Sequence, residues 1–348
     1  MKQNRQHSTS YQAGFSLVEI LVGLVIGLLA TLVIMQVFSV FEGQKRTTTG
    51  SADAQTNGGI ALYTMTRDLQ MAGFGLLPGS DSAIKCAVPA IFPAAAASVS
   101  SLSPVTITDG GAAAGASDSI TIRYGSSPAA GTPVPITLMT GGVDSIVDNN
   151  LGCETGIAII LTGSTTCNVT TVTALTGTTG VTLGDGGSAT AGNSLACMGQ
   201  WNEITYRSNA GRLERNATPA IADIVNIQAQ YGISNAASSN QVVQWVNATA
   251  GGTWDSATIT TANRNLIKAV RVAVVARNGL LEKDNVTVAC TTNKGTVNNG
   301  PCAWDDTNFD AAPAIDLSND PDWQRYRYRV FETIIPLRNV IWSKDTLI

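Results

Sequence analysis

The stretch that decides the fold is GFSLVEILVGLVIGLLATLVIMQVFSVF, residues 14–41. From Phe15 onward it is almost entirely apolar, with one acid, Glu19, near its start. As a helix, residues 15–41 would span about 40 Å, which exceeds the roughly 30 Å hydrocarbon core of a bilayer. The sequence therefore predicts one membrane-crossing helix that carries a carboxylate one turn from its beginning.

The segment before this helix looks like an export signal whose cleavage site is in an unusual place. Residues 1–14 carry Lys2 and Arg5 and no acid, as the basic region of a signal does. The small residues Ala13 and Gly14 precede the apolar run, whereas an ordinary secretory cleavage site follows it. A cut after Gly14 would remove the leader and leave the apolar helix on the mature chain.

GFSLVE, residues 14–19, resembles the class III leader of type IV pilins and of the pseudopilins of type II secretion. The resemblance implies that a prepilin peptidase cuts after Gly14 and methylates the new amino terminus at Phe15. It also implies that Glu19 pairs with that amine on a neighbouring subunit, which would set one axial register because either charge alone is costly in a low-dielectric bundle. The residues alone leave a second interpretation open, an acid tolerated at the membrane interface.

Two further features of the helix bear on packing and orientation. Gly23 and Gly27 have the GxxxG spacing that lets another helix approach closely, although this spacing also arises by chance. Lys45 and Arg46 follow the helix and balance the positive charges of the leader, so charge counting does not decide the orientation. The leader motif implies a cytoplasmic N-terminus, an inner-membrane anchor and a periplasmic chain beyond residue 41.

A second helical segment is predicted over residues 58–75. Its apolar side chains recur at spacings of three and four, which lays one stripe along a helix for docking on a globular domain; they are Leu62, Met65, Leu69 and Ala72. Gly58 and Gly59 are expected to weaken any continuous helix at this point. The sequence LYTMTRDLQMAGFG, residues 62–75, resembles the corresponding stretch of the PilW family of minor pilins.

Beyond residue 78 the composition favours short strands and loops, since Gly, Ala, Ser and Thr are abundant and charged residues make up 13% of the chain. Strands are predicted at 119–125, 155–163, 170–177, 221–234, 265–279 and 323–342, with a hairpin at 202–216 and long loops at 93–118 and 178–195. The segments QAQYGI, AVRVAVVAR and YRYRVFETIIPLRN again resemble PilW proteins in order and spacing. No such resemblance is evident between residues 79 and 200.

Three arginines alternate with apolar residues in the last predicted strand. Arg325, Arg327 and Arg329 would share one face of that strand because side chains alternate with period two. Such a face can be a solvated sheet surface or a docking surface for an acidic partner. The spacing does not distinguish these alternatives.

The six cysteines all follow the apolar helix, and none belongs to a CxxC pair. An even number in an exported chain indicates disulfides formed in an oxidising compartment. Loop closure favours Cys290 with Cys302 and Cys153 with Cys167, which leaves Cys86 with Cys197. The alternative is that some of them are buried thiols.

No catalytic chemistry is indicated. Nucleophile-elbow, zinc-protease and nucleotide-binding motifs are missing, and the sole histidine, His7, lies in the leader. The 235–262 loop offers only Asp255 as a charged oxygen ligand, which does not support a calcium site. The formal net charge of −4 gives no general attraction to nucleic acid. The sequence therefore predicts no catalytic site, cofactor, metal or direct nucleic-acid partner.

Taken together, the sequence predicts an α+β, pilin-like fold: a leader (1–14), a transmembrane and assembly helix (15–41), a periplasmic helix extension (42–78) and a mostly antiparallel β-rich head (79–348). The resemblance implies a minor pilin that primes a type IV pilus and lies at or near its tip, supporting motility or adhesion. Its partners would be other minor pilins, the major pilin, the prepilin peptidase, the inner-membrane assembly platform and a tip adhesin. Three alternatives stay open: a large type II secretion pseudopilin, a tip adhesin that binds through residues 79–200, and a membrane-anchored periplasmic enzyme.

Overall fold

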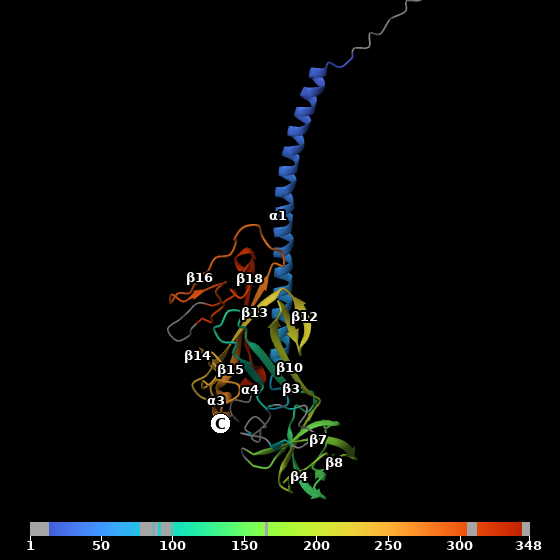
Figure 1. Cartoon of the computed structure of the whole chain (residues 1–348). Coiled ribbons are helices and arrows are strands. Elements are labelled where there is room, and N and C mark those ends of the chain that lie inside the picture. Colours follow the sequence, from blue (N-terminus) through green and yellow to red (C-terminus); the bar gives the residue numbers. More distant parts are fainter. Residues whose placement is uncertain are drawn as a thin grey trace, which may run out of the picture. The chain divides into compact units, whose positions relative to one another are not determined.

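The computed structural model describes residues 14–76, 86, 90–91, 99, 101–163, 166–304 and 312–342. The leader residues Lys2, Arg5, His7 and Ala13 lie outside these ranges. The chain forms two compact units, Met1–Gly50 and Ser51–Ile348. A long N-terminal helix precedes a mostly antiparallel β domain, which confirms the predicted α+β, pilin-like fold (Figure 1).

Helix α1 runs without interruption from Leu17 to Met71. Gly58 and Gly59 therefore do not interrupt the helix, and the second helical segment predicted over residues 58–75 is a continuation of the first. Gly58 is buried, and the ring of Phe331 occupies the space that a side chain at this position would need. Tertiary packing thus outweighs the low helix propensity of glycine, as it commonly does in protein helices.

The apolar stripe of the second half of α1 is buried as predicted. Met65, Leu69 and Ala72 are fully buried and Leu62 packs against the same core. This core also contains Ile122 and other side chains from two antiparallel sheets. The helix ends in glycine-containing turns, where Gly73 and Gly75 adopt positive φ angles that favour glycine.

The two sheets that pack on this core are antiparallel. The first has the order β12 (Thr218–Ala222), β11 (Arg212–Arg215), β10 (Trp201–Asn209), β3 (Ser119–Gly125), β2 (Val105–Thr108). The second has the order β14 (Gln244–Val246), β13 (Ile224–Ile233), β15 (Ile267–Arg277), β18 (Tyr328–Pro336). Strand β15 is central and buried along nearly its whole length, as its run of Val and Ala predicts. Short elements complete this part: α3 (Thr261–Leu266), β16 (Cys290–Thr291), β17 (Val297–Asn298), η2 (Trp323–Arg325) and α4 (Arg338–Trp342).

A third set of strands forms a small closed barrel. Its strands are β4 (Pro133–Thr140), β5 (Asp144–Val147), β6 (Gly156–Leu161), β7 (Cys167–Thr176), β8 (Gly180–Leu183) and β9 (Ser194–Gly199). They pair in the order β7-β6-β9-β4-β5-β8, and β8 also pairs with β7, which closes the ring. Strand β1 (Ala90–Ile91) joins β7 from outside in parallel. A separate apolar cluster that includes Ile136, Ile160 and Leu195 is buried among these strands.

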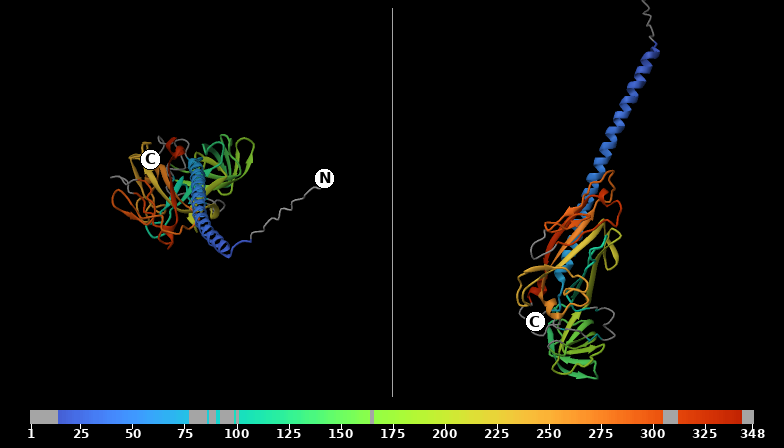
Figure 2. Two further views of the ribbon diagram at one scale, coloured as in Figure 1. Left: turned by 90° about the horizontal axis from the view of Figure 1, so that it is seen from above. Right: turned by 60° about the vertical axis from the view of Figure 1, so that its left-hand side comes forward.

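The barrel is an insertion between two strands that are partners in the first sheet. Strands β3 and β10 pair directly, with Gly125 opposite Trp201, and β4–β9 lie between them in sequence. Figure 2 shows these green strands grouped together from two further directions. At the junction the Met198 carbonyl accepts hydrogen bonds from the amides of Ser126 and Ser127, at 2.9 and 3.0 Å. The barrel thus leaves the β3–β10 pairing intact.

Both of the long loops predicted from the sequence contain a strand. Strand β2 lies inside the stretch expected as a loop at 93–118, and β8 lies inside that expected at 178–195. Each is four residues long, and each is held by pairing with strands elsewhere in the chain. Local patterning did not reveal them because their partners supply the stabilising contacts.

Two of the three disulfide pairings differ from the prediction. The structure joins Cys86 to Cys167 and Cys153 to Cys197, whereas Cys290 is joined to Cys302 as expected. Cys153 precedes β6, and Cys167 lies opposite Leu161 at the other end of that strand. Cys153 packs against the apolar cluster among the barrel strands, whereas Cys167 belongs to the core that contains Met65 and Leu69. Short sequence separation was therefore misleading.

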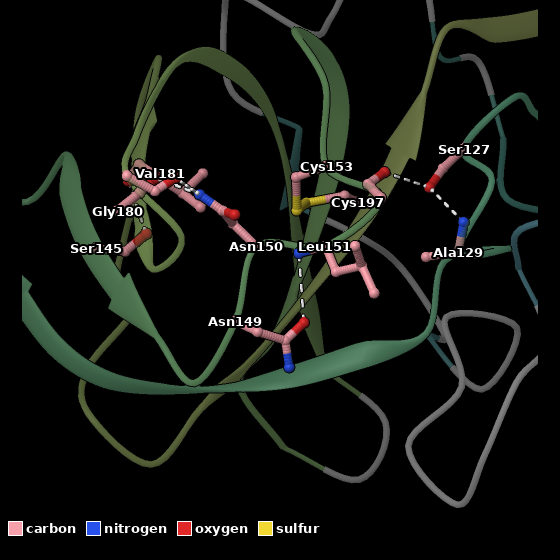
Figure 3. The surroundings of a disulfide bond; sticks show 12 residues. Ser127, Ala129, Ser145, Asn149, Asn150, Leu151, Cys153, Gly180, Val181 and Cys197 are labelled. Carbon is pink, nitrogen blue, oxygen red and sulfur yellow. Dashed lines mark hydrogen bonds between the residues drawn. A yellow bond between two sulfur atoms is a disulfide. The ribbon is translucent and has the colours of Figure 1, made fainter.

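The barrel geometry explains the pairing of Cys153. Strand β9 lies beside β6, so Cys197 reaches the segment that precedes β6 (Figure 3). That segment is held in place by Asn150, whose side-chain amide donates to the carbonyls of Gly177 and Gly180, both at 3.1 Å. The disulfide therefore links the loop before β6 to strand β9 of the barrel.

Candidate functional site

The predicted cleavage junction lies in exposed, non-helical backbone. Gly14, Phe15 and Ser16 precede α1, and the phenyl side chain of Phe15 is 80% exposed. The carbonyl of Ser16 accepts hydrogen bonds from the amides of Glu19 and Ile20, at 3.0 and 3.2 Å, and so starts the helix. The bond between Gly14 and Phe15 is therefore accessible and lies in non-helical backbone, where a peptidase can bind it.

Glu19 lies in the first turn of α1 and is exposed. A negative charge is favourable there because the first amides of a helix are unpaired and the helix dipole is positive at this end. This local effect explains why the acid does not disturb the helix. It leaves the carboxylate available for a positive group outside the chain.

The apolar half of α1 has no partner among the described residues of the first unit. The large side chains of residues 17–41 are about half exposed or more, and none of the most apolar stretch of the helix is buried against the described chain. A surface of this size is not stable in water. By length and composition, this helix can cross a membrane.

Gly23 and Gly27 lie one turn apart on this exposed helix. A Cβ built on either residue meets no atom within 4 Å. Neither glycine is therefore required by packing inside the described chain. Both leave room on the same helix face for close approach of another helix.

The three arginines do not share a strand face, so this prediction is wrong. Arg325 ends the helical turn η2, Arg327 lies in the following link, and only Arg329 belongs to β18. Arg325 pairs with Asp322 at 3.1 Å and Arg327 with Glu282 at 2.9 Å. The alternation failed because the strand begins at Tyr328, and the first two charges are matched within the chain.

A polar cluster missed by the sequence reasoning joins the second half of α1 to the first sheet. Asp68 Oδ2 accepts from Tyr206 Oη at 2.6 Å and from Arg215 Nε at 3.1 Å. Arg215 Nε also lies 3.2 Å from Tyr206 Oη. Burial and the neighbouring Asp68 raise the pKa of Tyr206, so the phenol stays protonated and donates. Asp68 lies outside the apolar stripe of the helix, and only the fold shows that its carboxylate is part-buried.

A buried carboxyl group joins the loop after β2 to strand β13. Asp118 is 3% exposed and accepts from the amides of Gly110 and Ala229, at 2.9 and 2.8 Å. Burial raises its pKa to about 7, even though these two hydrogen bonds favour the charged form. The group is therefore a structural acid that titrates close to neutral pH.

The described residues contain no group of three or more His, Cys, Asp or Glu side chains that could hold a metal ion. Asp255 accepts hydrogen bonds from the amides of Gly251 and Ala257, and these bonds lower its pKa. The carboxylate thus shapes the turn that contains it.

Comparison with known protein families gives two matches. Residues 191–339 match the family described as type IV pilus-assembly protein W, and residues 9–35 match the prokaryotic N-terminal methylation motif. No curated protein and no solved structure matches the chain. The two matched segments contain the predicted cleavage junction, Glu19 and most of the two sheets, whereas most of the barrel lies between them.

Proposed function

We propose that this chain, a PilW-family type IV minor pilin, primes pilus assembly with other minor pilins and stays at or near the pilus tip. The observation that carries the proposal is the exposed apolar helix that begins directly after the Gly14–Phe15 junction and has one acid in its first turn. Such a helix needs lipid before assembly and other helices after it. A structural role of this kind needs no catalytic group.

The proposed location follows from the same helix. Before assembly it anchors the chain in the bacterial inner membrane, with the leader in the cytoplasm and the β domain in the periplasm. The three disulfides support an oxidising compartment for the β domain. The partners we propose are the prepilin peptidase, the inner-membrane assembly platform, the major pilin, other minor pilins and a tip adhesin.

Cleavage after Gly14 would create a positive amine at Phe15, one helical turn from Glu19. Within one helix the Phe15 amine would lie near the Glu19 carboxylate. Between helices the amine of one subunit would be the positive partner of Glu19 on its neighbour. Since an unpaired charge costs several kcal/mol in a water-poor helix bundle, one axial register between neighbouring subunits is preferred. Glu19 then acts in assembly, and Phe15 supplies the amine.

The test compares Glu19→Ala with Glu42→Ala in cells that lack the native gene. Both residues are exposed acids on α1, but Glu42 follows the apolar segment. We expect Glu19→Ala to reach the membrane and be cleaved normally, while its amount in sheared pili and the number of pili per cell fall at least tenfold. Glu42→Ala should behave as wild type. Normal piliation and incorporation of Glu19→Ala would refute the register role.

Processing and tip position have separate measurements. Gly14→Leu should accumulate as uncut precursor, detected by intact mass, and a mature chain that starts at Phe15 in this variant would contradict the assigned junction. Immunogold labelling of the β domain should mark one end of each pilus. Labelling along the whole shaft would contradict the tip position.

The exposed glycines supply a further test of helix packing. Gly23→Ile and Gly27→Ile should reduce incorporation, because each places a branched side chain where a neighbouring backbone would approach. The control is Ser39→Ile, which adds similar volume on the opposite side of the helix. Equal incorporation of all three variants would assign the two glycines no packing role.

The pilus is preferred to a type II secretion system because the family match is to a pilus-assembly protein. Deletion of the gene separates these functions. We expect loss of pili with normal protein secretion, and the reverse result would favour a pseudopilin.

A further inference from the structure

A cavity of about 400 Å³ opens in the β domain. It lies beside residues 208–211, which form the end of β10 and the turn into β11, and beside the loop at 317–320. Val225 of β13, Arg277 at the end of β15 and Tyr328 at the start of β18 also line it. The volume is within the range of small-molecule sites. Gly115 also lines the cavity, and every other lining residue follows residue 200. Because the barrel strands span residues 133–199, the cavity is distinct from the barrel.

The charges in the cavity balance. Arg277 Nη1 donates to Asp320 Oδ2 at 3.0 Å, and these are the charged side chains among the described residues that line it. The guanidinium also lies 4.2 Å from the centre of the Tyr326 ring, which holds it in one orientation. An anionic ligand would have to displace Asp320, and a cationic ligand would be repelled by Arg277. A neutral ligand avoids both costs.

The cavity also offers several hydrogen-bonding groups that the protein does not fully use. Arg277 Nε is buried without a partner among the described residues. Asn209 donates through Nδ2 to Glu214 at 2.8 Å, which leaves its carbonyl oxygen as an acceptor. The Asn319 side chain is exposed at the rim, and no hydrogen bond joins it to the described chain. Hydrogen-bond donors and acceptors therefore lie together around the Arg277–Asp320 ion pair.

Apolar surface completes the lining. Val225 and Leu317 contribute aliphatic groups, and the ring of Tyr328 is fixed because its hydroxyl donates to the Trp323 carbonyl at 3.0 Å. Gly211, at φ 71°, holds the turn close to Arg277, since a Cβ there would lie 3.5 Å from Nη2. Sugars match this combination, because adjacent hydroxyl groups bond to amide, carboxylate and guanidinium groups while their C–H faces pack on aromatic and aliphatic carbon.

We propose that this cavity binds a neutral saccharide unit, a hexose or a disaccharide, through Arg277, Asn209, Asn319 and Asp320. Binding would give the β domain a contact with polysaccharide that is independent of pilus assembly. The proposal does not rest on the assembly role, and the failure of either leaves the other standing.

The test uses the full chain in a phosphocholine detergent, because glycoside detergents carry sugar head groups that would compete. Saturation-transfer NMR should detect maltose, cellobiose, lactose or chitobiose, but not glucuronate or N-acetylneuraminate. Asn319→Ala should raise the dissociation constant roughly two- to twelvefold, because one net hydrogen bond is lost. Asn240→Ala, a change at an exposed amide elsewhere, should have no effect.

Asp320→Asn tests the charge argument. It leaves Arg277 unmatched, so preference should move from neutral sugars towards glucuronate. The melting temperatures of all variants are measured in parallel, so that a folding defect is not mistaken for lost binding. Two results would overturn the proposal: no neutral sugar binds the wild-type chain at tens of millimolar, or binding is unchanged in both Asn319→Ala and Asp320→Asn.

Discussion

The ring of Phe331 on strand β18 lies directly against the backbone of Gly58 on helix α1, in the space a Cβ would occupy. The adjacent Gly59 faces open space, with no atom within 4 Å of such a Cβ. Two neighbouring glycines with the same helix propensity therefore have opposite packing roles. This contact fixes how closely the helix approaches the last strand of the second sheet.

Exchanging each glycine for alanine separates packing from propensity. Gly58→Ala should destabilise the chain by about 1–3 kcal/mol, because Phe331 must move from its place. Gly59→Ala should stabilise it by up to about 1 kcal/mol, since alanine is the better helix former. Guanidinium unfolding of the full chain in detergent measures both. Equal effects of the two changes would show that the Phe331 contact carries no energy.

This pair also shows where sequence reasoning reached its limit. The stripe of Leu62, Met65 and Leu69 identified the buried face of the helix, because periodicity is a local property. Gly58 was interpreted as a weak point because its reason for being glycine lies on β18, far away in the sequence. Propensity is a weak guide where a distant side chain fills the available space.

The same limit applies to the candidate site. The motif around Gly14, Phe15 and Glu19 could be found in the sequence because all its parts lie within six residues. The alternation of Arg325, Arg327 and Arg329 was also local, but the acids that pair with the first two and the start of the strand were not visible in it. The cavity beside Arg277 combines segments from residue 115 to residue 328 and had no local signal.

The cluster of Asp68, Tyr206 and Arg215 should contribute measurably to stability. Tyr206→Phe removes the hydroxyl that donates to Asp68 at 2.6 Å and leaves a part-buried carboxylate with one partner fewer. We expect a loss of about 1–3 kcal/mol in the free energy of unfolding. Tyr63→Phe is the matched control, because Tyr63 is 70% exposed on α1, the helix that carries Asp68. A loss of similar size in the control would mean that the cluster is not the cause.

Asp118 should make stability depend on pH. Its pKa is raised from 3.8 to about 7 in the folded chain, so the folded state binds more protons than the unfolded state between about pH 4 and 7. The contribution of Asp118 to the free energy of unfolding therefore decreases as pH rises through that window. Asp118→Asn should flatten this part of the profile measured by guanidinium unfolding, whereas Asp148→Asn, at an exposed acid, should leave it unchanged. A profile of the same slope in Asp118→Asn would assign the dependence to other groups.

The disulfide pairing can be decided with double alanine variants. If Cys86 is bonded to Cys167 and Cys153 to Cys197, as in the structure, then removing Cys86 and Cys197 together leaves Cys153 and Cys167 without partners, and these two residues lie in different apolar clusters. Removing Cys86 and Cys167 instead orphans none. A thiol assay of the unfolded chains, made without reductant, should count two free thiols in the first variant and none in the second.

The same two variants report how much the bonds contribute. The first lacks two disulfides and should be several kcal/mol less stable than the second, because removing one native disulfide typically costs about 2–5 kcal/mol. Non-reducing peptide mapping of the wild-type chain provides an independent check and should recover a peptide pair that contains Cys153 and Cys197. Recovery of Cys153 linked to Cys167 would contradict the observed pairing, since the structure places these two residues in different apolar clusters.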